Sequence, residues 1–396
     1  MNTRVLVGAT LIDGTGREPL SNATVVLVDN KIAQVGRGEA VAYDREQAEV
    51  VDLTGKTVVP GLIDMHVHLG SPEGNPAEMA SASETLAALT GAQRARQALL
   101  RGVTTVRDCG SLHLTNVKLR NLIASGFIPG PRICACGDVI VMTGGHGHRM
   151  GVEVDSPDEV RKLARRNLKA GAECLKLMAN GLSVNSPELS APEMRAAVEV
   201  AHDAGLKVAA HASVWRAVEN ALVAGVDTIE HGYTIDAAMA ERMVAQGTIV
   251  VPTLATVTRV YKQGSQFPGW REKMAAVKAR IDNAMTSFRL AREAGVKFGL
   301  GTDGSSKPLL SVGEVASEAR ALSEIGLSNM EILRAATAIA AEGLAWQDRL
   351  GTVEPGKLAD LTILDGDPLA DLDAWRSVYM VIKDGATVVA NGALVE

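Results

Sequence analysis

The chain has 396 residues, a net charge of −6 at pH 7 and 46% apolar residues. This length allows two to three ordinary domains or one large barrel with an appendage, and the composition can bury a substantial core. The acidic balance argues against nucleic-acid binding, and no apolar run reaches the ~20 residues that span a bilayer. Because the first residues reach polar turns too early for a signal peptide, we expect a cytoplasmic protein without nucleic-acid or membrane partners.

The two ends of the chain have the pattern of β-hairpins. Residues 1–57 contain short β-type runs separated by DGTGRE, DN and GRG, and residues 352–396 contain ADLTILDGD, SVYMVIKDG and ATVVANGALV. Such runs with turn residues between them predict antiparallel strands. We expect both ends to pair into one small β-sandwich domain, 1–57 plus 352–396, beside a second domain over 58–351.

The middle of the chain repeats one pattern, in which a helical stretch ends in glycine and a short β-type run follows. Glycine suits the position just after a helix, where a positive φ is needed. The candidate strands are 58–69, 101–108, 132–137, 170–177, 204–211, 224–231, 246–253 and 294–301. Strands that alternate with helices predict a parallel sheet, and eight of them predict an α/β fold, a closed (β/α)₈ TIM barrel. The stretch 256–272, TVTRVYKQGSQFPGWRE, is a candidate irregular lid.

The first barrel strand carries a His-x-His pair. In VVPGLIDMHVHL, strand alternation predicts that Asp64, His66 and His68 face one way. Two imidazoles at the end of a strand can bind one metal ion through neutral nitrogens. The alternative is a pair of partly exposed histidines that leave the core.

Four later positions have the same character. Lys176 is predicted to point into the barrel, where an unpaired ammonium is costly. His211, His231 and Asp303 each lie at the end of a candidate strand. One such histidine alone is more often structural, but the C-terminal ends of barrel strands meet at one mouth, where active sites lie. The joint pattern therefore predicts a metal site.

These segments resemble the amidohydrolase superfamily over nearly the whole chain. The resemblance lies in PGLIDMHVH, the strand-borne Lys176, His211, the IEHG around His231, the GTDG around Asp303 and LGTVEPGKLADLTILDGDPL at 350–369. The TGGHGH at 143–148 and the order of the groups look most like the imidazolonepropionase-related branch, which contains Xaa-Pro and other dipeptidases. The resemblance implies two divalent metal ions, usually zinc, bridged by a lysine that CO₂ has converted to a carbamate.

Carried over residue by residue, the resemblance implies a binuclear centre. His66, His68 and Asp303 would bind the first metal, His211 and His231 the second, and carboxylated Lys176 both. A hydroxide shared by the metals would attack an amide carbonyl. Asp303 would move the proton to the leaving amine, and His146 would contact the developing oxyanion or the substrate.

The substrate contacts depart from the dipeptidase pattern. Relatives often carry a tyrosine two residues after the fifth-strand histidine, where this chain has Ser213. Tyr233 or Arg149 would have to replace that contact to a substrate carboxylate. We therefore take His146, Tyr233, Ser213 and Arg149 as candidate substrate-binding residues; for the loop histidine His146, the alternative is a solvated residue on a flexible glycine loop.

The sequence thus predicts a metal-dependent amidohydrolase that cleaves an amide bond of a small molecule, such as an Xaa-Pro dipeptide or an N-acyl amino acid. One alternative is hydrolysis of a carbamate, urea, cyclic amide or lactone on the same binuclear site. A second is a mononuclear deaminase, although such enzymes generally lack the bridging lysine. A third, of another class, is an inactive barrel scaffold. A homo-oligomer is compatible with each of them.

Overall fold

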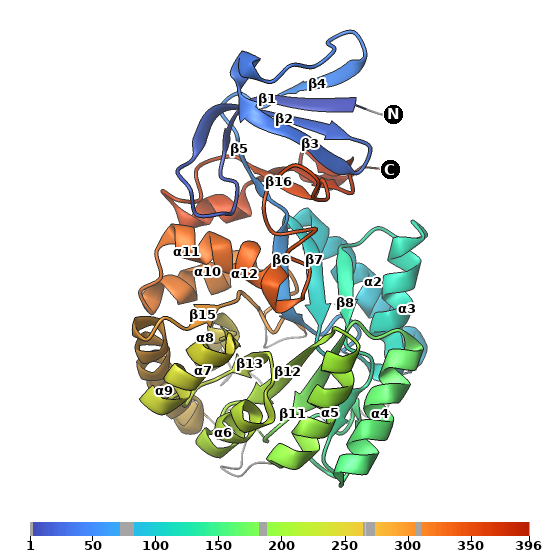
Figure 1. The fold of residues 1–396 in the computed structure, drawn as a ribbon, viewed down its shortest axis with the longest axis vertical. Helices are drawn as coiled ribbons and strands as arrows, with labels where there is room; N and C mark the ends of the chain where they lie inside the picture. The colour runs from blue at the N-terminus through green and yellow to red at the C-terminus, as the bar shows by residue number, and fades with distance from the viewer. Residues whose placement is uncertain are drawn as a thin grey trace.

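The computed structural model describes residues 3–71, 83–181, 188–263, 266, 274–305 and 310–395. Figure 1 shows two parts. Strands from both chain ends lie together at the top of the view, and alternating strands and helices form the larger part below them. None of the helices in the described part of the chain is long and apolar enough to cross a membrane.

The two chain ends form one hydrogen-bonded sheet with the order β19-β18-β17-β16-β5-β1-β2-β3, in which β4 also pairs with β1. Its strands are β1 (Thr3–Leu11), β2 (Leu20–Val28), β3 (Lys31–Arg37), β4 (Ala48–Asp52), β5 (Thr57–Pro60), β16 (Leu361–Leu364), β17 (Val378–Lys383), β18 (Ala386–Ala390) and β19 (Ala393–Leu394). The ends meet where β5 pairs antiparallel with β16. One apolar cluster then joins them, since Leu6 and Val25 share it with Leu361.

The run expected as a single strand over 58–69 is two strands. β5 belongs to the sheet of the chain ends, whereas β6 (Leu62–Val67) pairs with β7 (Val103–Asp108). The chain crosses between them at Gly61, where a Cβ atom would lie 2.1 Å from Thr104 Oγ1. Only glycine fits so close an approach, and Val58, where the second domain was expected to begin, lies inside β5.

The larger part contains two parallel sheets, with the orders β6-β7-β8 and β10-β9-β11-β12-β13-β14-β15. The further strands are β8 (Arg132–Ala135), β9 (Val139–Val141), β10 (Gly151–Glu153), β11 (Cys174–Met178), β12 (Lys207–Ala212), β13 (Thr228–His231), β14 (Ile249–Val251) and β15 (Lys297–Phe298). Each of the predicted runs overlaps one of these strands, while β9 and β10 were not expected as separate strands. Backbone bonds link the sheets, from Glu173 N to Ala135 O (2.8 Å) and from Met65 N to Leu300 O (2.9 Å).

Helices alternate with these strands and surround them (Figure 1). They are α2 (Glu84–Leu100), α3 (Thr115–Ala124), α4 (Pro157–Ala170), α5 (Ala191–Asp203), α6 (Trp215–Ala224), α7 (Ala237–Gln246), α8 (Leu254–Gln263), α9 (Met274–Glu293), α10 (Val315–Glu324), α11 (Asn329–Ala335) and α12 (Ala338–Gly343). Gly171 and Gly225 end α4 and α6 with φ of 94° and 86°, which explains the glycine after each helical stretch.

The expected irregular lid over 256–272 is wrong for its first half. Residues 256–263 belong to α8, whose Leu254, Val257 and Val260 are buried in the main core. This apolar spacing is helical, and it outweighs the polar residues between. Of the remainder, 264–265 and 267–272 lie outside the described residues.

Candidate metal centre and active site

Side chains from the carboxyl ends of separate strands meet at one place. His66 comes from β6, Lys176 from β11, His211 from β12 and His231 from β13, and Asp303 follows β15. All but Asp303 are buried, and Lys176 has no exposed surface. On β11, Leu175 and Leu177 pack into the main apolar core. Lys176 points the other way and places Nζ 3.4 Å from His66 Nε2.

One set of donors fits a single metal ion. His66 Nε2 lies 3.7 Å and His68 Nε2 3.4 Å from Asp303 Oδ1. The ligand atoms of these three residues all lie within 4.8 Å of one another. Two imidazole nitrogens and a carboxylate are donors that zinc and similar divalent ions accept.

His211 and His231 stand beside this set. Their ring centroids are 4.4 Å apart, and the His231 ring is 5.3 Å from that of His66. His211 Nε2 is buried without a hydrogen-bond partner. A buried nitrogen with no partner is costly unless something else binds it. His211 Nε2 is therefore a candidate ligand atom beside the first set.

The histidines are held in the neutral form that binds metal. Burial lowers the pKa of His66 and His211 well below the ordinary value and lowers that of His231 to about 3. Burial alone would raise the pKa of Asp303, but the hydrogen bond with His68 and the surrounding imidazoles hold it well below its usual range. The site thus combines neutral imidazoles with an ionised carboxylate.

The other ring nitrogens are engaged away from the centre. His66 Nδ1 lies 2.6 Å from Glu230 Oε2, His68 Nδ1 donates to the carbonyl of Gly110 (2.9 Å), and His231 Nδ1 is 2.8 Å from Thr253 Oγ1. Such partners fix the ring orientation and leave Nε2 for a metal.

Glu230 belongs to a buried network that the sequence analysis missed. Its Oε1 accepts from Arg107 Nη2 (2.6 Å), and Arg107 Nε donates to the carbonyl of Met65 (2.7 Å). Neither Arg107 nor Glu230 has exposed surface. Strand alternation puts Glu230 opposite its neighbour His231, but His231 has φ of 73°, so alternation breaks and both side chains reach the interior. The sequence offered only two signals of this network, namely the acidic residue in IEHG and the arginine in VTTVRD.

Asp64 does not join the centre, although the pattern placed it with His66 and His68. It accepts hydrogen bonds from Thr302 N (2.9 Å) and Thr302 Oγ1 (2.6 Å). Burial raises its pKa to about 6. Asp64 therefore ties β6 to the segment that carries Asp303.

The loop that carries His146 is anchored. His146 N donates to Glu188 Oε2 (2.8 Å), and Gly144 N donates to Glu153 Oε1 (2.7 Å). The His146 ring lies 4.8 Å from the His211 ring, and burial lowers its pKa to about 4. Arg149, farther along the loop, is exposed. The structure thus brings His146 to the centre on a tethered loop.

The remaining candidates lie near the centre in different ways. The Tyr233 ring is 5.7 Å from that of His231, and its hydroxyl is 3.5 Å from Thr253 Oγ1. Ser213 Oγ accepts from the buried Asn180 amide (3.0 Å), and Ser213 N donates to Asn180 Oδ1 (2.8 Å). Burial lowers the pKa of His146 and raises that of Tyr233; the positive charge of Arg280, a residue not singled out from the sequence, adds a smaller lowering effect at both.

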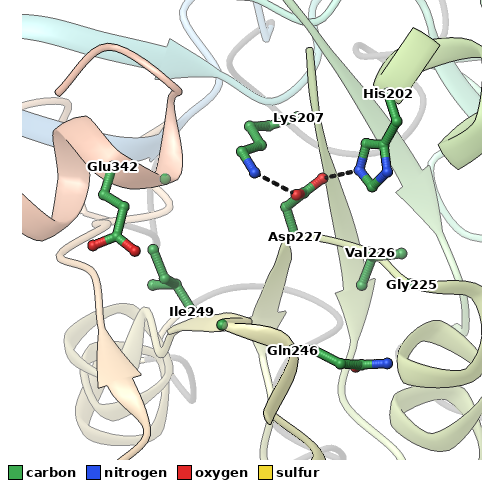
Figure 2. A pocket seen from close by; sticks show the side chains of 10 residues that line it. His202, Lys207, Gly225, Val226, Asp227, Gln246, Ile249 and Glu342 are labelled. Carbon is green, nitrogen blue, oxygen red and sulfur yellow. Dashed lines mark hydrogen bonds and ion pairs between the residues drawn. The ribbon is translucent and has the colours of Figure 1, made fainter. Parts of the chain in front are cut away.

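A separate cavity of about 280 Å³ lies at the other end of the strands (Figure 2). Its Lys207 is the first residue of β12, whereas the cluster residue His211 is near the end of that strand. Asp227 pairs there with Lys207 (2.7 Å) and with His202 (2.9 Å). Because it lies at the opposite end of β12, the cavity is distinct from the cluster described above, and its Lys207 and His202 both pair with Asp227.

Comparison with known proteins gives a consistent result. Residues 57–388 match the amidohydrolase family. The chain is 27% identical to ochratoxinase from Aspergillus niger over 96% of its own length and 85% of that protein. A solved Xaa-Pro dipeptidase with bound methionine is 32% identical, with a TM-score of 0.88 over 98% of this chain and 99% of that one. A prolidase complexed with N-methylphosphonate-L-proline is 33% identical, with a TM-score of 0.89 over 98% and 100% of the chains. The likeness establishes a TIM-barrel-like α/β fold.

Proposed function

Because this chain belongs to the amidohydrolase family and is a hydrolase of C–N bonds, we propose that it cleaves an amide bond of a small molecule at a centre of two divalent metal ions. The observation that carries the proposal is the meeting of His66, His68 and Asp303 within 4.8 Å, with the unpartnered Nε2 of His211 close by. His211 and His231 would hold the second ion.

Lys176 would bridge the two ions as a carbamate. Its amine is buried among imidazoles, 3.4 Å from His66 Nε2. An ammonium in this position forms no ion pair within the described part of the chain, which is unfavourable. Addition of CO₂ to the neutral amine forms an N–C bond and releases one proton, so that a carboxylate anion replaces the cation. That anion has two oxygens to share between two cations.

Two bound ions, which we propose to be zinc, would polarise the amide carbonyl and activate a water molecule. Asp303 would accept the proton of that water, because its carboxylate is ionised, and deliver it to the leaving nitrogen. His146, uncharged because burial lowers its pKa to about 4, would donate an N–H to the developing oxyanion. Its tethered loop keeps that donor in place before the substrate arrives.

His146 gives a prediction for catalysis without loss of metal. We expect His146→Ala to lower kcat by about 10²–10³, the usual effect of losing one oxyanion donor, with the metal content unchanged. Because the pKa of His146 is about 4, its imidazole is already neutral above about pH 5. The acid limb of the kcat/KM profile above that pH should therefore not move.

His148→Ala is the matched control, since this neighbouring histidine is exposed and its Nδ1 contacts the carbonyl of Gly145 (2.9 Å). It should leave kcat unchanged. A His146→Ala enzyme that loses metal, or that keeps full kcat, would contradict the assigned role.

We propose a dipeptide such as Xaa-Pro, or an N-acyl amino acid, as the substrate. The similar dipeptidase and prolidase structures support this class. His146, Tyr233, Ser213 and Arg149 remain the proposed substrate contacts. Arg280 adds a positive charge whose effect reaches both His146 and Tyr233, which suits a substrate carboxylate.

A specific observation favours the second candidate, hydrolysis of a carbamate, urea, cyclic amide or lactone. The Ser213 hydroxyl accepts a hydrogen bond from Asn180. Because a serine is shorter than the tyrosine that dipeptidases often carry at this position, the contact to a substrate carboxylate would be lost here, and the substrates of the second candidate do not need it. Lys176 beside His66 argues against a mononuclear deaminase, and the donor set around His66 argues against an inactive scaffold.

We also propose a cytoplasmic location. That the protein forms a homo-oligomer stays a prediction.

We further infer that the parallel strands close into a (β/α)₈ barrel and that the sheet of the chain ends is a separate composite domain. The bond from Met65 N to Leu300 O (2.9 Å) supports closure on one side and that from Glu173 N to Ala135 O (2.8 Å) on the other. The domain boundary would then lie at Gly61 rather than Val58.

A substrate panel tests the proposed function. Metal-loaded protein is assayed with Xaa-Pro dipeptides, N-acetyl amino acids, the C-terminal amides of both, and small carbamates, ureas and lactones. We expect the free acids to be cleaved and their amides to be poor substrates. Preference for carbamates, ureas or lactones would replace the proposed substrate class. No turnover of any of these compounds by protein that holds two metals would contradict both proposed substrate classes.

A further inference from the structure

We propose that the two metal positions are inequivalent, and that the position held by His66, His68 and Asp303 binds its ion more tightly and fills first because Glu230 supports His66 with a buried carboxylate. This inference rests on the proposed binuclear centre. It goes beyond that proposal because it concerns the order and strength of loading, which the ligand set alone does not determine.

The ligand histidines differ in what their outer nitrogens contact. His66 Nδ1 lies 2.6 Å from the carboxylate of Glu230, which has no exposed surface. His231 Nδ1 instead contacts the neutral hydroxyl of Thr253 at 2.8 Å. A carboxylate partner makes the imidazole a stronger ligand and adds a negative charge near the ion. That charge acts strongly because water does not screen it in the interior.

Arg107 fixes the orientation of the Glu230 carboxylate. Its guanidinium binds Oε1 of Glu230 at 2.6 Å, while Oε2 faces His66. Arg107 also donates to Thr228 Oγ1 (2.9 Å) and to the carbonyl of Met65 (2.7 Å), so it cannot turn toward the metal centre without losing these bonds. The carboxylate is therefore held between a cation on one side and His66 on the other.

The second position has no comparable support. Among the described residues, no carboxylate hydrogen-bonds to the rings of His211 or His231, and His211 Nε2 has no partner. The first position also contains the Asp303 carboxylate, 3.4 Å from His68 Nε2. Both carboxylates thus contact ligands of the first ion directly. The second ion would depend on two neutral imidazoles and the shared carbamate.

Metal titration tests the inference without measuring catalysis. Protein freed of metal by a chelator is titrated with Zn²⁺ in bicarbonate buffer against a chromophoric chelator. A parallel titration with Co²⁺ follows visible absorbance. We expect two steps, with the first at least about tenfold tighter than the second, the lower end of the effect of such outer partners. Two equal steps would overturn the inference while leaving the binuclear proposal intact, whereas binding of one ion or none would contradict both.

Two variants assign the steps. Arg107→Met combined with Glu230→Gln removes both buried charges but retains a neutral acceptor for His66, and should weaken the first step by about 10–100-fold. Thr253→Val removes the hydroxyl that contacts His231 and should weaken only the second step. The inference is wrong if the double variant weakens only the second step or neither.

A matched control separates metal binding from stability. Asp360, which directly precedes β16, is a buried carboxylate 3.3 Å from Arg132 Nη2. Asp360→Asn should lower the melting temperature and leave both binding steps unchanged. If it weakened the first step as much as the double variant, a general loss of stability would explain the effect and the inference would fail.

Discussion

Lys176→Ala is expected to abolish hydrolysis and to deplete the centre of metal while the fold persists. The Lys176 side chain has no exposed surface and reaches to 3.4 Å from His66 Nε2. Without it, the second ion would keep only His211 and His231 as protein ligands. The loss in kcat/KM should exceed the roughly 100-fold that outer partners of metal ligands can cause. The measurements are kcat/KM, metal per chain and circular dichroism.

Lys207→Ala is the control for this prediction. Lys207 also lies on a parallel strand, but at its opposite end, where it pairs with Asp227 (2.7 Å). That variant should keep its metal and its activity. Small carboxylic acids such as acetate should restore part of the activity of Lys176→Ala by taking the place of the carbamate. Full activity of Lys176→Ala without such an acid would be incompatible with the bridging role.

Arg107→Met is expected to cause the largest loss of stability, about 3–5 kcal/mol in the free energy of unfolding. It removes the cation that lies 2.6 Å from Glu230 and leaves a carboxylate without exposed surface unpaired. Arg107 also donates to the carbonyl of Met65 (2.7 Å), which would lose its partner. Denaturant unfolding of metal-free protein, followed by circular dichroism, measures the effect without a contribution from bound ions.

The double variant Arg107→Met with Glu230→Gln should recover much of that loss, because no uncompensated charge remains. Two results would show that the pair is not the cause: an unchanged midpoint in Arg107→Met, or a double variant no more stable than the single one.

Much of the fold was predictable because its signals are local. A glycine that ends a helix needs a positive φ, as Gly171 and Gly225 have, and the β-type run that follows marks a strand. The crossing at Gly61 was not predictable, because it depends on the approach of Thr104 from another strand. The first half of the expected lid is helix α8, whose buried Leu254, Val257 and Val260 give it a helical apolar face.

In the candidate site, too, residues with a local sequence signal were predictable and residues placed by distant segments were not. Most of the proposed ligands could be singled out because they lie at or just after the ends of strands, which meet in a parallel fold, and Lys176 because alternation along its strand turns it away from the apolar core. These residues are His66, His68, Lys176, His211, His231 and Asp303. Glu230 could not, because the positive φ of His231 breaks the alternation on which its placement depended. Asn180 and Arg280 act through contacts between distant segments, which no local pattern records.

Metal content per chain, measured on protein purified without chelator together with native mass spectrometry of Lys176, decides whether the binuclear centre exists. We expect close to two divalent ions per chain and the added mass of CO₂ on Lys176. One ion with an unmodified lysine would contradict the binuclear centre and favour a mononuclear deaminase. No metal after metal-supplemented growth would favour an inactive scaffold.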